Sequence, residues 1–146
     1  MLSLAAMQTA DIDGVLALEK GSLSAWNRKH LEDELRQAAG FQFVGRDAFS
    51  GKLLGVICGR IGAEEGEILK LAVRGSMRRT GIGTQLLDYG LEYCRQQGVK
   101  HGYLELRASN AAARQLYEKC GFVEAGRRKG YYDAPREDAI LMQLEL

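Results

Sequence analysis

The chain has 146 residues, of which 46% are hydrophobic and 27% are charged, and its formal net charge is +1. This size and balance are typical of one globular domain, so we expect residues 1–146 to form a single domain. A net charge this close to zero gives no general attraction to nucleic acid or to anionic membrane, and neither is expected as a direct partner. The sequence has no apolar run of about 20 residues and opens without a basic leader, which predicts a cytoplasmic protein.

The three cysteines are far apart and form no CxxC pair: Cys58, Cys94 and Cys120. With two histidines in the chain, the spacing of these residues offers no tetrahedral metal site, so no metal is expected. We expect small, buried thiols in a reducing compartment.

The first half of the chain predicts a strand, two helices and three further strands. Alternating apolar residues predict the first strand at residues 2–6, and Thr9 or Asp11 is placed to cap the helix that follows. The second helix is predicted to begin at Trp26-Asn27 and to end at Gly40. Strands are then expected at residues 41–48, 52–61 and 67–73.

The second half predicts a helix, a strand, a helix and two strands. A long helix with apolar residues at helical spacing begins at Gly81 and ends near Gly98. A strand at residues 101–107 and a helix at residues 110–120 follow, with two strands expected around residues 131–137. The order predicts an α/β fold with a mixed sheet of about seven strands flanked by helices.

The loop before the long helix has the composition of a phosphate-binding loop. Two basic residues and two glycines lie in the stretch Arg78-Arg79-Thr80-Gly81-Ile82-Gly83-Thr84. Glycine lets backbone N–H groups close around an anion, and a helix N-terminus adds unpaired N–H donors and about half a unit of positive charge. A diphosphate is the expected ligand, although two glycines alone could also serve as a flexible helix entry.

Two other nucleotide-binding loops do not match this stretch. The dinucleotide fingerprint needs a small third residue, and Leu86 stands there instead. A Walker A loop needs Gly-Lys-Ser/Thr, which the stretch lacks.

These blocks resemble the GNAT superfamily of acetyl-CoA-dependent N-acetyltransferases. Residues 79–84 are similar to its signature Q/R-x-x-G-x-G/A, in which the loop binds the coenzyme A pyrophosphate. Residues 104–122, LELRASNAAARQLYEKCGF, and the tail segments 127–132 and 136–140 resemble the bacterial ribosomal-protein-alanine N-acetyltransferases of the RimI type. The likeness covers about residues 67–144 and implies the GNAT fold with acetyl-CoA as cosubstrate.

Two positions depart from that family pattern. Arg74-Gly75 stands where the family usually has Asp-Pro, which concerns the geometry of the loop. Ala25 stands where a proline usually precedes Trp26, which concerns the choice of acceptor.

The resemblance also implies roles for individual residues. Glu105 matches the general base of the family, and Tyr117 matches the acid that protonates the departing thiolate and contacts the coenzyme. Asn110 would cap a helix and contact the coenzyme. Backbone groups of three residues would hold the acetyl and pantetheine portions: Leu71, Ala72 and Val73.

Each catalytic candidate has an alternative. Glu105 and Arg107 share a face of the predicted strand and could form a plain solvated pair. Glu67 is the competing base, because histone-type relatives place theirs on this earlier strand. Tyr117 could be an aromatic residue that only packs. Cys120 lies on an apolar stripe and is not expected to act as a nucleophile.

The expected acceptor is the N-terminal α-amine of a protein, with a ribosomal-protein alanine as the family's substrate. An α-amine with a pKa of about 7.7–8 is roughly one tenth neutral at pH 7, whereas a lysine near about 10.4 is neutral in fewer than about one in a thousand molecules. Tyr131 and Tyr132 could wall a peptide groove or simply pack. The alternatives are an enzyme for a small amine or a lysine, and a non-catalytic acetyl-CoA sensor. A monomer or weak dimer is expected.

Overall fold

The computed structural model describes residues 1–78 and 80–146. Within these residues, seven strands form one mixed sheet in the order β1-β2-β3-β4-β5-β7-β6. The strands are β1 (Leu2–Ala6), β2 (Gly40–Asp47), β3 (Leu53–Gly62), β4 (Glu65–Val73), β5 (His101–Arg107), β6 (Val123–Tyr132) and β7 (Glu137–Glu145). The helices are α1 (Ile12–Leu18), α2 (Arg28–Leu35), α3 (Ile82–Gln96) and α4 (Ala111–Lys119), with short 3₁₀ turns at Thr9–Asp11 and Gly75–Met77.

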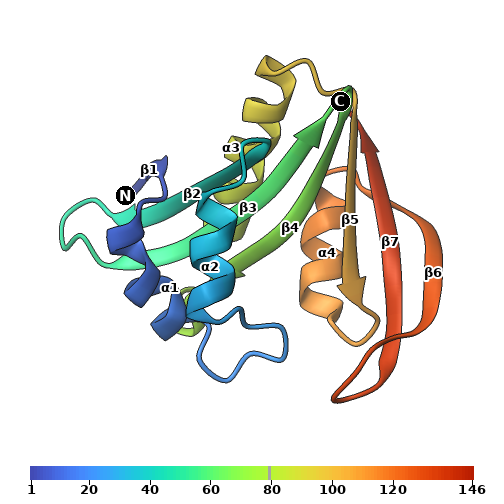
Figure 1. Cartoon of the computed structure of the whole chain (residues 1–146), viewed down its shortest axis with the longest axis horizontal. Coiled ribbons are helices and arrows are strands. Elements are labelled where there is room, and N and C mark those ends of the chain that lie inside the picture. The colour runs from blue at the N-terminus through green and yellow to red at the C-terminus, as the bar shows by residue number, and fades with distance from the viewer. Residues whose placement is uncertain (79) are drawn as a thin grey trace.

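The sheet opens between β4 and β5, which are parallel neighbours for only part of their length. Their pairing ends at Ile68 and Leu104, although β4 runs on to Val73 and β5 to Arg107. Figure 1 shows the two strands close together near the C-terminus and apart at their other ends. The register of β4 against β3 shifts beside Cys58, as in a β-bulge, and a bulge increases local twist. The open end leaves one edge of β4 without a neighbouring strand.

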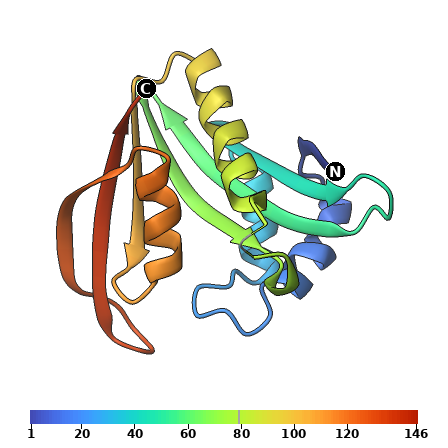
Figure 2. The same ribbon diagram turned by 180° about the vertical axis from the view of Figure 1, so that it is seen from behind.

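Helices cover both faces of the sheet. One apolar core joins the sheet to α3 and α4 and contains Ile57, Leu86 and Leu104. A second core joins the other face to α1 and α2 and contains Val15, Leu31 and Val56. Figure 2 shows α3 and α4 together on the face turned toward the viewer. None of the helices in the described ranges is long and apolar enough to cross a membrane.

The predicted order of elements and the mixed seven-stranded sheet are confirmed, but three details differ. The second helix ends at Leu35 rather than at Gly40, because turn bonds close it and Gly40 already begins β2. Neither Thr9 nor Asp11 caps α1 through its side chain: the Asp11 carboxylate instead accepts the Gln8 N–H and pairs with Arg46. The last two strands are far longer than residues 131–137, which form the hairpin connection and the strand ends beside it.

Candidate active site

The free edge of β4 is the backbone part of the site. Leu71, Ala72 and Val73 pair with β3 on one side, and β5 has already diverged on the other. An unpaired strand edge presents N–H and C=O groups that a ligand can bind. These are the three residues for which the sequence predicts backbone contacts with the acetyl and pantetheine groups.

The loop after β4 leads directly into α3. Gly81 has φ of 86°, in the left-handed region, and precedes the first helical residue, Ile82. The Gln85 N–H donates to the Gly81 carbonyl at 3.1 Å, so the amides of the first helical turn before it have no partner within the helix. Arg78 is exposed beside this end, and the Thr80 hydroxyl donates to the Met77 carbonyl.

This arrangement fits a diphosphate, because three amides without helical partners lie at a helix N-terminus and an exposed arginine precedes it in the chain. The amides belong to Ile82, Gly83 and Thr84. Arg79, also predicted to bind the coenzyme, lies outside the described residues.

Close packing between α3 and α4 requires glycine at position 83, which the sequence did not reveal. A Cβ at this position would lie 3.1 Å from Leu116 Cδ2 on α4 and 3.6 Å from Val73 Cγ2 on β4. The missing side chain therefore lets α3 approach α4 closely. The Cβ direction points into the protein, so a substitution here would disturb packing in addition to any effect on an anion.

Glu105 lies on β5 in the predicted orientation. Leu104 and Leu106 are buried in the core, whereas Tyr103, Glu105 and Arg107 are half-buried on the opposite face. The Glu105 side chain is 22% exposed and accepts from Arg128 Nε of β6 at 3.2 Å. The alternative pairing with Arg107 is wrong, because the Arg107 guanidinium contacts Pro135, Asp133 and Glu137 instead.

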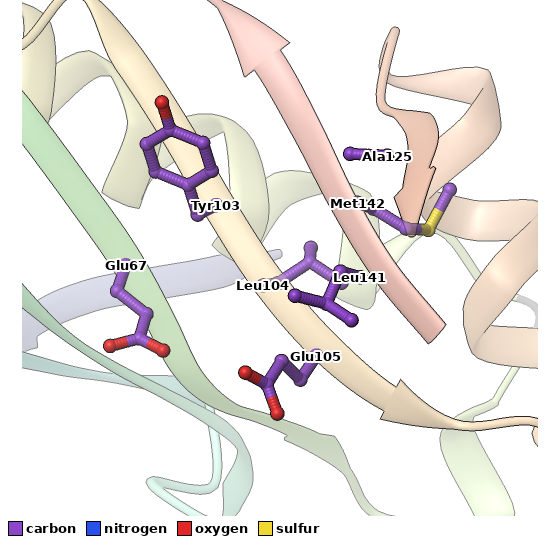
Figure 3. A pocket seen from close by; sticks show the side chains of 7 residues that line it. All are labelled: Glu67, Tyr103, Leu104, Glu105, Ala125, Leu141 and Met142. Atoms are coloured by element: carbon purple, nitrogen blue, oxygen red, sulfur yellow. The ribbon is translucent and has the colours of Figure 1, made fainter. Parts of the chain in front are cut away.

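Glu67 and Glu105 line one cavity of about 160 Å³. Figure 3 shows both side chains on neighbouring strands, together with Tyr103, which is the register partner of Glu67. Burial raises the pKa of Glu67, and the nearby Glu105 carboxylate raises it further. The cavity thus combines a carboxyl group that holds its proton more readily with a second carboxylate beside it.

Tyr131 and Tyr132 are the last two residues of β6 and lie outside the set of residues that lines this cavity. Their rings meet edge to face at 5.1 Å between centroids, and Arg107 lies over the Tyr132 ring at 4.5 Å. Burial, followed by the charge of Glu105, raises the pKa of Tyr132. Tyr131 is exposed and Tyr132 is half-buried, so the pair lies at the surface rather than in the core, and its role as the wall of a peptide groove stays a prediction.

Tyr117 lies on α4 and is 7% exposed. Its ring packs edge to face against Phe122, with 5.7 Å between centroids. Burial is the main cause that raises the pKa of Tyr117, so this hydroxyl keeps its proton. Asn110 caps α4 as predicted, since its side chain accepts from the Ala113 N–H at 3.2 Å.

The three cysteines are free thiols. Cys58 and Cys94 are buried as predicted, and Cys120 is half-buried. Burial raises the pKa of Cys58 to about 12 and that of Cys94 to about 11, which keeps both thiols protonated. Across residues 1–78 and 80–146, no three His, Cys, Asp or Glu side chains gather as metal ligands would.

Sequence reasoning missed two parts of this region. The first is Arg128, the ion-pair partner of Glu105, which no local pattern links to β5. The second is a buried pair between Lys70 of β4 and Glu19 at the end of α1. A signal for the second existed, because a lysine inside the apolar run ILKLAV must find a partner if the strand is buried.

Comparisons with known proteins agree with this geometry. The model of the acetyltransferase (GNAT) family matches residues 12–122. The [ribosomal protein bS18]-alanine N-acetyltransferase of Escherichia coli strain K12 is 31% identical over 150 residues, which covers 100% of this chain and 99% of that protein. A putative enzyme of the same name from Bacillus subtilis is 31% identical over 93% of this chain and 90% of its own length.

Solved structures give the same result. The crystal structure of the ribosomal-protein-S18-alanine N-acetyltransferase from Escherichia coli matches 99% of this chain and 94% of its own, with a TM-score of 0.90 and 30% identity. Ard1 from Thermoplasma volcanium matches with a TM-score of 0.89 and 28% identity, covering 99% and 97% of the two chains. The chain therefore belongs to the acetyltransferase (GNAT) family and is an N-acetyltransferase, of a family that takes its acetyl group from acetyl-CoA.

Proposed function

We propose that the protein acetylates the N-terminal α-amine of a protein, and that an alanine at the N-terminus of a ribosomal protein is the natural acceptor. The observation that carries the proposal is the position of Glu105 beside the open end between β4 and β5. Similarity over the full length to a bS18-alanine N-acetyltransferase supports the choice of acceptor.

Acetyl-CoA would lie along the opening. The first turn of α3, with Arg78, Arg79 and Thr80, would hold the diphosphate, and Asn110 on α4 would contact the coenzyme. The free edge of β4 would hold the pantetheine and bind the thioester carbonyl oxygen through backbone N–H groups, as in an oxyanion hole. The described residues fit this ligand, since a helix N-terminus and an unpaired strand edge lie at the same open end of the sheet.

Glu105 would remove a proton from the incoming amine. The amine nitrogen forms a bond to the acetyl carbon, the carbon–sulfur bond breaks, and the electron pair leaves with sulfur. Tyr117 would donate its hydroxyl proton to that thiolate. Because burial raises the pKa of Tyr117, the hydroxyl is protonated before reaction. Complete proton transfer to a thiolate, whose conjugate thiol has a pKa of about 8.5, is harder than for an ordinary tyrosine.

An α-amine suits this site better than a lysine, because less work is needed to deprotonate it. The Glu105 carboxylate would attract the protonated amine before it reacts. We expect a small first residue such as alanine or serine, since the amine must approach the thioester closely.

Two matched peptides test this proposal. Both contain an internal lysine, but one has a free N-terminus and the other a blocked one. We expect acetylation only at the free α-amine, located by fragment mass spectrometry. Equal labelling of the lysine in the blocked peptide would contradict the proposal, and turnover on small amines alone would favour a metabolic acceptor. Acetyl-CoA binding without turnover on any amine would indicate a sensor.

A further inference from the structure

Lys70 and Glu19 form a buried ion pair close to the proposed site. Lys70 Nζ lies 2.7 Å from Glu19 Oε2, and the two side chains are 6% and 5% exposed. The Lys70 ammonium also lies 4.7 Å from the centroid of the Trp26 ring. Strand β4 thus meets the segment of residues 19–27, which connects α1 to α2.

Ser24 in this segment is held from two sides. Its backbone carbonyl accepts from Lys70 Nζ at 3.1 Å, and its hydroxyl accepts from Arg107 Nε at 3.3 Å. Lys70 lies beyond the last β4 residue that pairs with β5, and Arg107 lies beyond the last β5 residue that pairs with β4. The segment is therefore attached to both strands after they diverge, and Figure 1 and Figure 2 both show it at this open end.

Arg107 also binds the connection between β6 and β7. Its guanidinium donates to the carbonyls of Pro135 at 3.0 Å and Asp133 at 3.2 Å. The side chain is only 10% exposed, and Nη1 lies 3.9 Å from Oε1 of Glu137 at the start of β7. One arginine thus joins two loops that come from distant parts of the sequence, and both border the face that carries Glu105.

Stability alone does not explain the buried pair. Removing two charges from water is costly, and apolar residues of similar volume often stabilise a protein as well as a buried ion pair does. Glu19 Oε1 is buried and has no hydrogen-bond partner among the described residues, which adds to that cost. The pair instead fixes the position of the connecting segment, because the Lys70 ammonium that binds Glu19 also donates to the Ser24 carbonyl.

We propose that Lys70 and Arg107 are positioning residues that hold residues 19–27 across the acceptor side of the opening and so set how the amine approaches Glu105. This inference rests on the proposed function. Lys70 and Ala72 face the core formed with α1 and α2, whereas α3 and its first turn lie on the other face. Arg107 shares the face of Glu105 on β5. Lys70 and Arg107 therefore act on acceptor binding and not on acetyl-CoA binding.

The test is the double variant Glu19→Leu/Lys70→Met, which removes both charges and keeps the volume. We expect the KM for a free-N-terminus peptide to rise about tenfold with little change in kcat, the pattern of lost acceptor binding. The dissociation constant of acetyl-CoA should stay the same, and amide hydrogen exchange of residues 20–26 should become faster.

The matched control is Asp11→Asn/Arg46→Met. It removes an ion pair at the opposite end of α1, where the pair joins the helix to β2 and not to the opening. We expect wild-type KM values and wild-type exchange in residues 20–26. A second variant, Arg107→Gln, leaves the buried pair intact and should also raise the acceptor KM without changing acetyl-CoA affinity.

Folded variants with a wild-type acceptor KM and unchanged exchange would overturn the inference, as would an equal loss of acetyl-CoA affinity. If the double variant does not fold, the same measurements on Arg107→Gln decide. If the wild-type protein fails to acetylate any peptide N-terminus, the proposed function fails, and unchanged hydrogen exchange would still overturn the positioning role separately.

Discussion

The two sides of the opening between β4 and β5 are built differently: one from a continuous stretch of backbone, the other from side chains of distant elements. On the proposed coenzyme side, the free edge of β4 and the first turn of α3 are both backbone, and they lie within the continuous stretch of residues 71–84. On the proposed acceptor side, side chains of β4 and β5 reach across to the α1–α2 connection and to backbone carbonyls of the β6–β7 connection. We therefore expect substitutions of side chains on the acceptor side to leave the coenzyme side unchanged.

The largest expected effect is on the acceptor side, at the base. Glu105→Gln keeps the shape of the side chain and removes its ability to take a proton. We expect kcat/KM to fall by about 10²–10⁴ with the acetyl-CoA dissociation constant unchanged. Glu67→Gln is the control; if it were crippled while Glu105→Gln stayed nearly normal, the two roles would have to be exchanged.

Tyr117→Phe tests the proposed general acid on α4. Loss of the hydroxyl should lower kcat roughly 100-fold, which is the low end of the range of about 10²–10⁴ for general acid–base catalysis. The low end is expected because the raised pKa of Tyr117 already hinders complete proton transfer. The acceptor KM should not change. Stopped-flow or steady-state rates with a free-N-terminus peptide measure this, and a variant with wild-type kcat would show that Tyr117 only packs against Phe122.

Gly83→Val tests the coenzyme side, where Gly83 both packs against α4 and contributes to the proposed diphosphate site. The new side chain would meet Leu116 and Val73, so we expect a loss of stability of about 1–3 kcal/mol together with weaker acetyl-CoA binding. Adding Leu116→Ala should restore part of the melting temperature but not the affinity measured by calorimetry. Full recovery of affinity would mean that packing alone explains this glycine.

The smallest effect concerns Glu67 and is a pH dependence of stability. Its pKa is raised above the ordinary value of 4.5 by burial and by Glu105, so the folded protein favours the protonated form. The stabilisation from that form is complete below the ordinary pKa and is lost as the pH rises through the raised pKa. Glu67→Gln should therefore match the wild type in acid and exceed its melting temperature at neutral pH. The opposite order in thermal denaturation would contradict the assignment.

Much of the coenzyme side could be predicted from the sequence because its parts are local. A strand, a loop with two glycines and a helix follow one another, and Gly81 indeed adopts a positive φ just before α3. The orientation of Glu105 was also predictable, since alternation along a strand fixes which side chains share a face. Asn110 was a recognisable cap for the same local reason.

The acceptor side was less predictable because its contacts join distant residues. Nothing near Glu105 in the sequence indicates that Arg128, rather than Arg107, is its partner. The contacts of Lys70 and Arg107 with Ser24 likewise depend on how far β4 and β5 diverge, which the pattern of each strand does not show.

The most direct test of the central claim is N-terminal mass spectrometry of ribosomal proteins from cells with and without the gene. We expect one ribosomal protein with an N-terminal alanine to be acetylated when the gene is present and to carry a free α-amine when it is deleted. A gene that encodes the Glu105→Gln variant should fail to restore the modification. If no protein N-terminus differs between the two strains while lysine or small-amine acetylation does, the claim is contradicted.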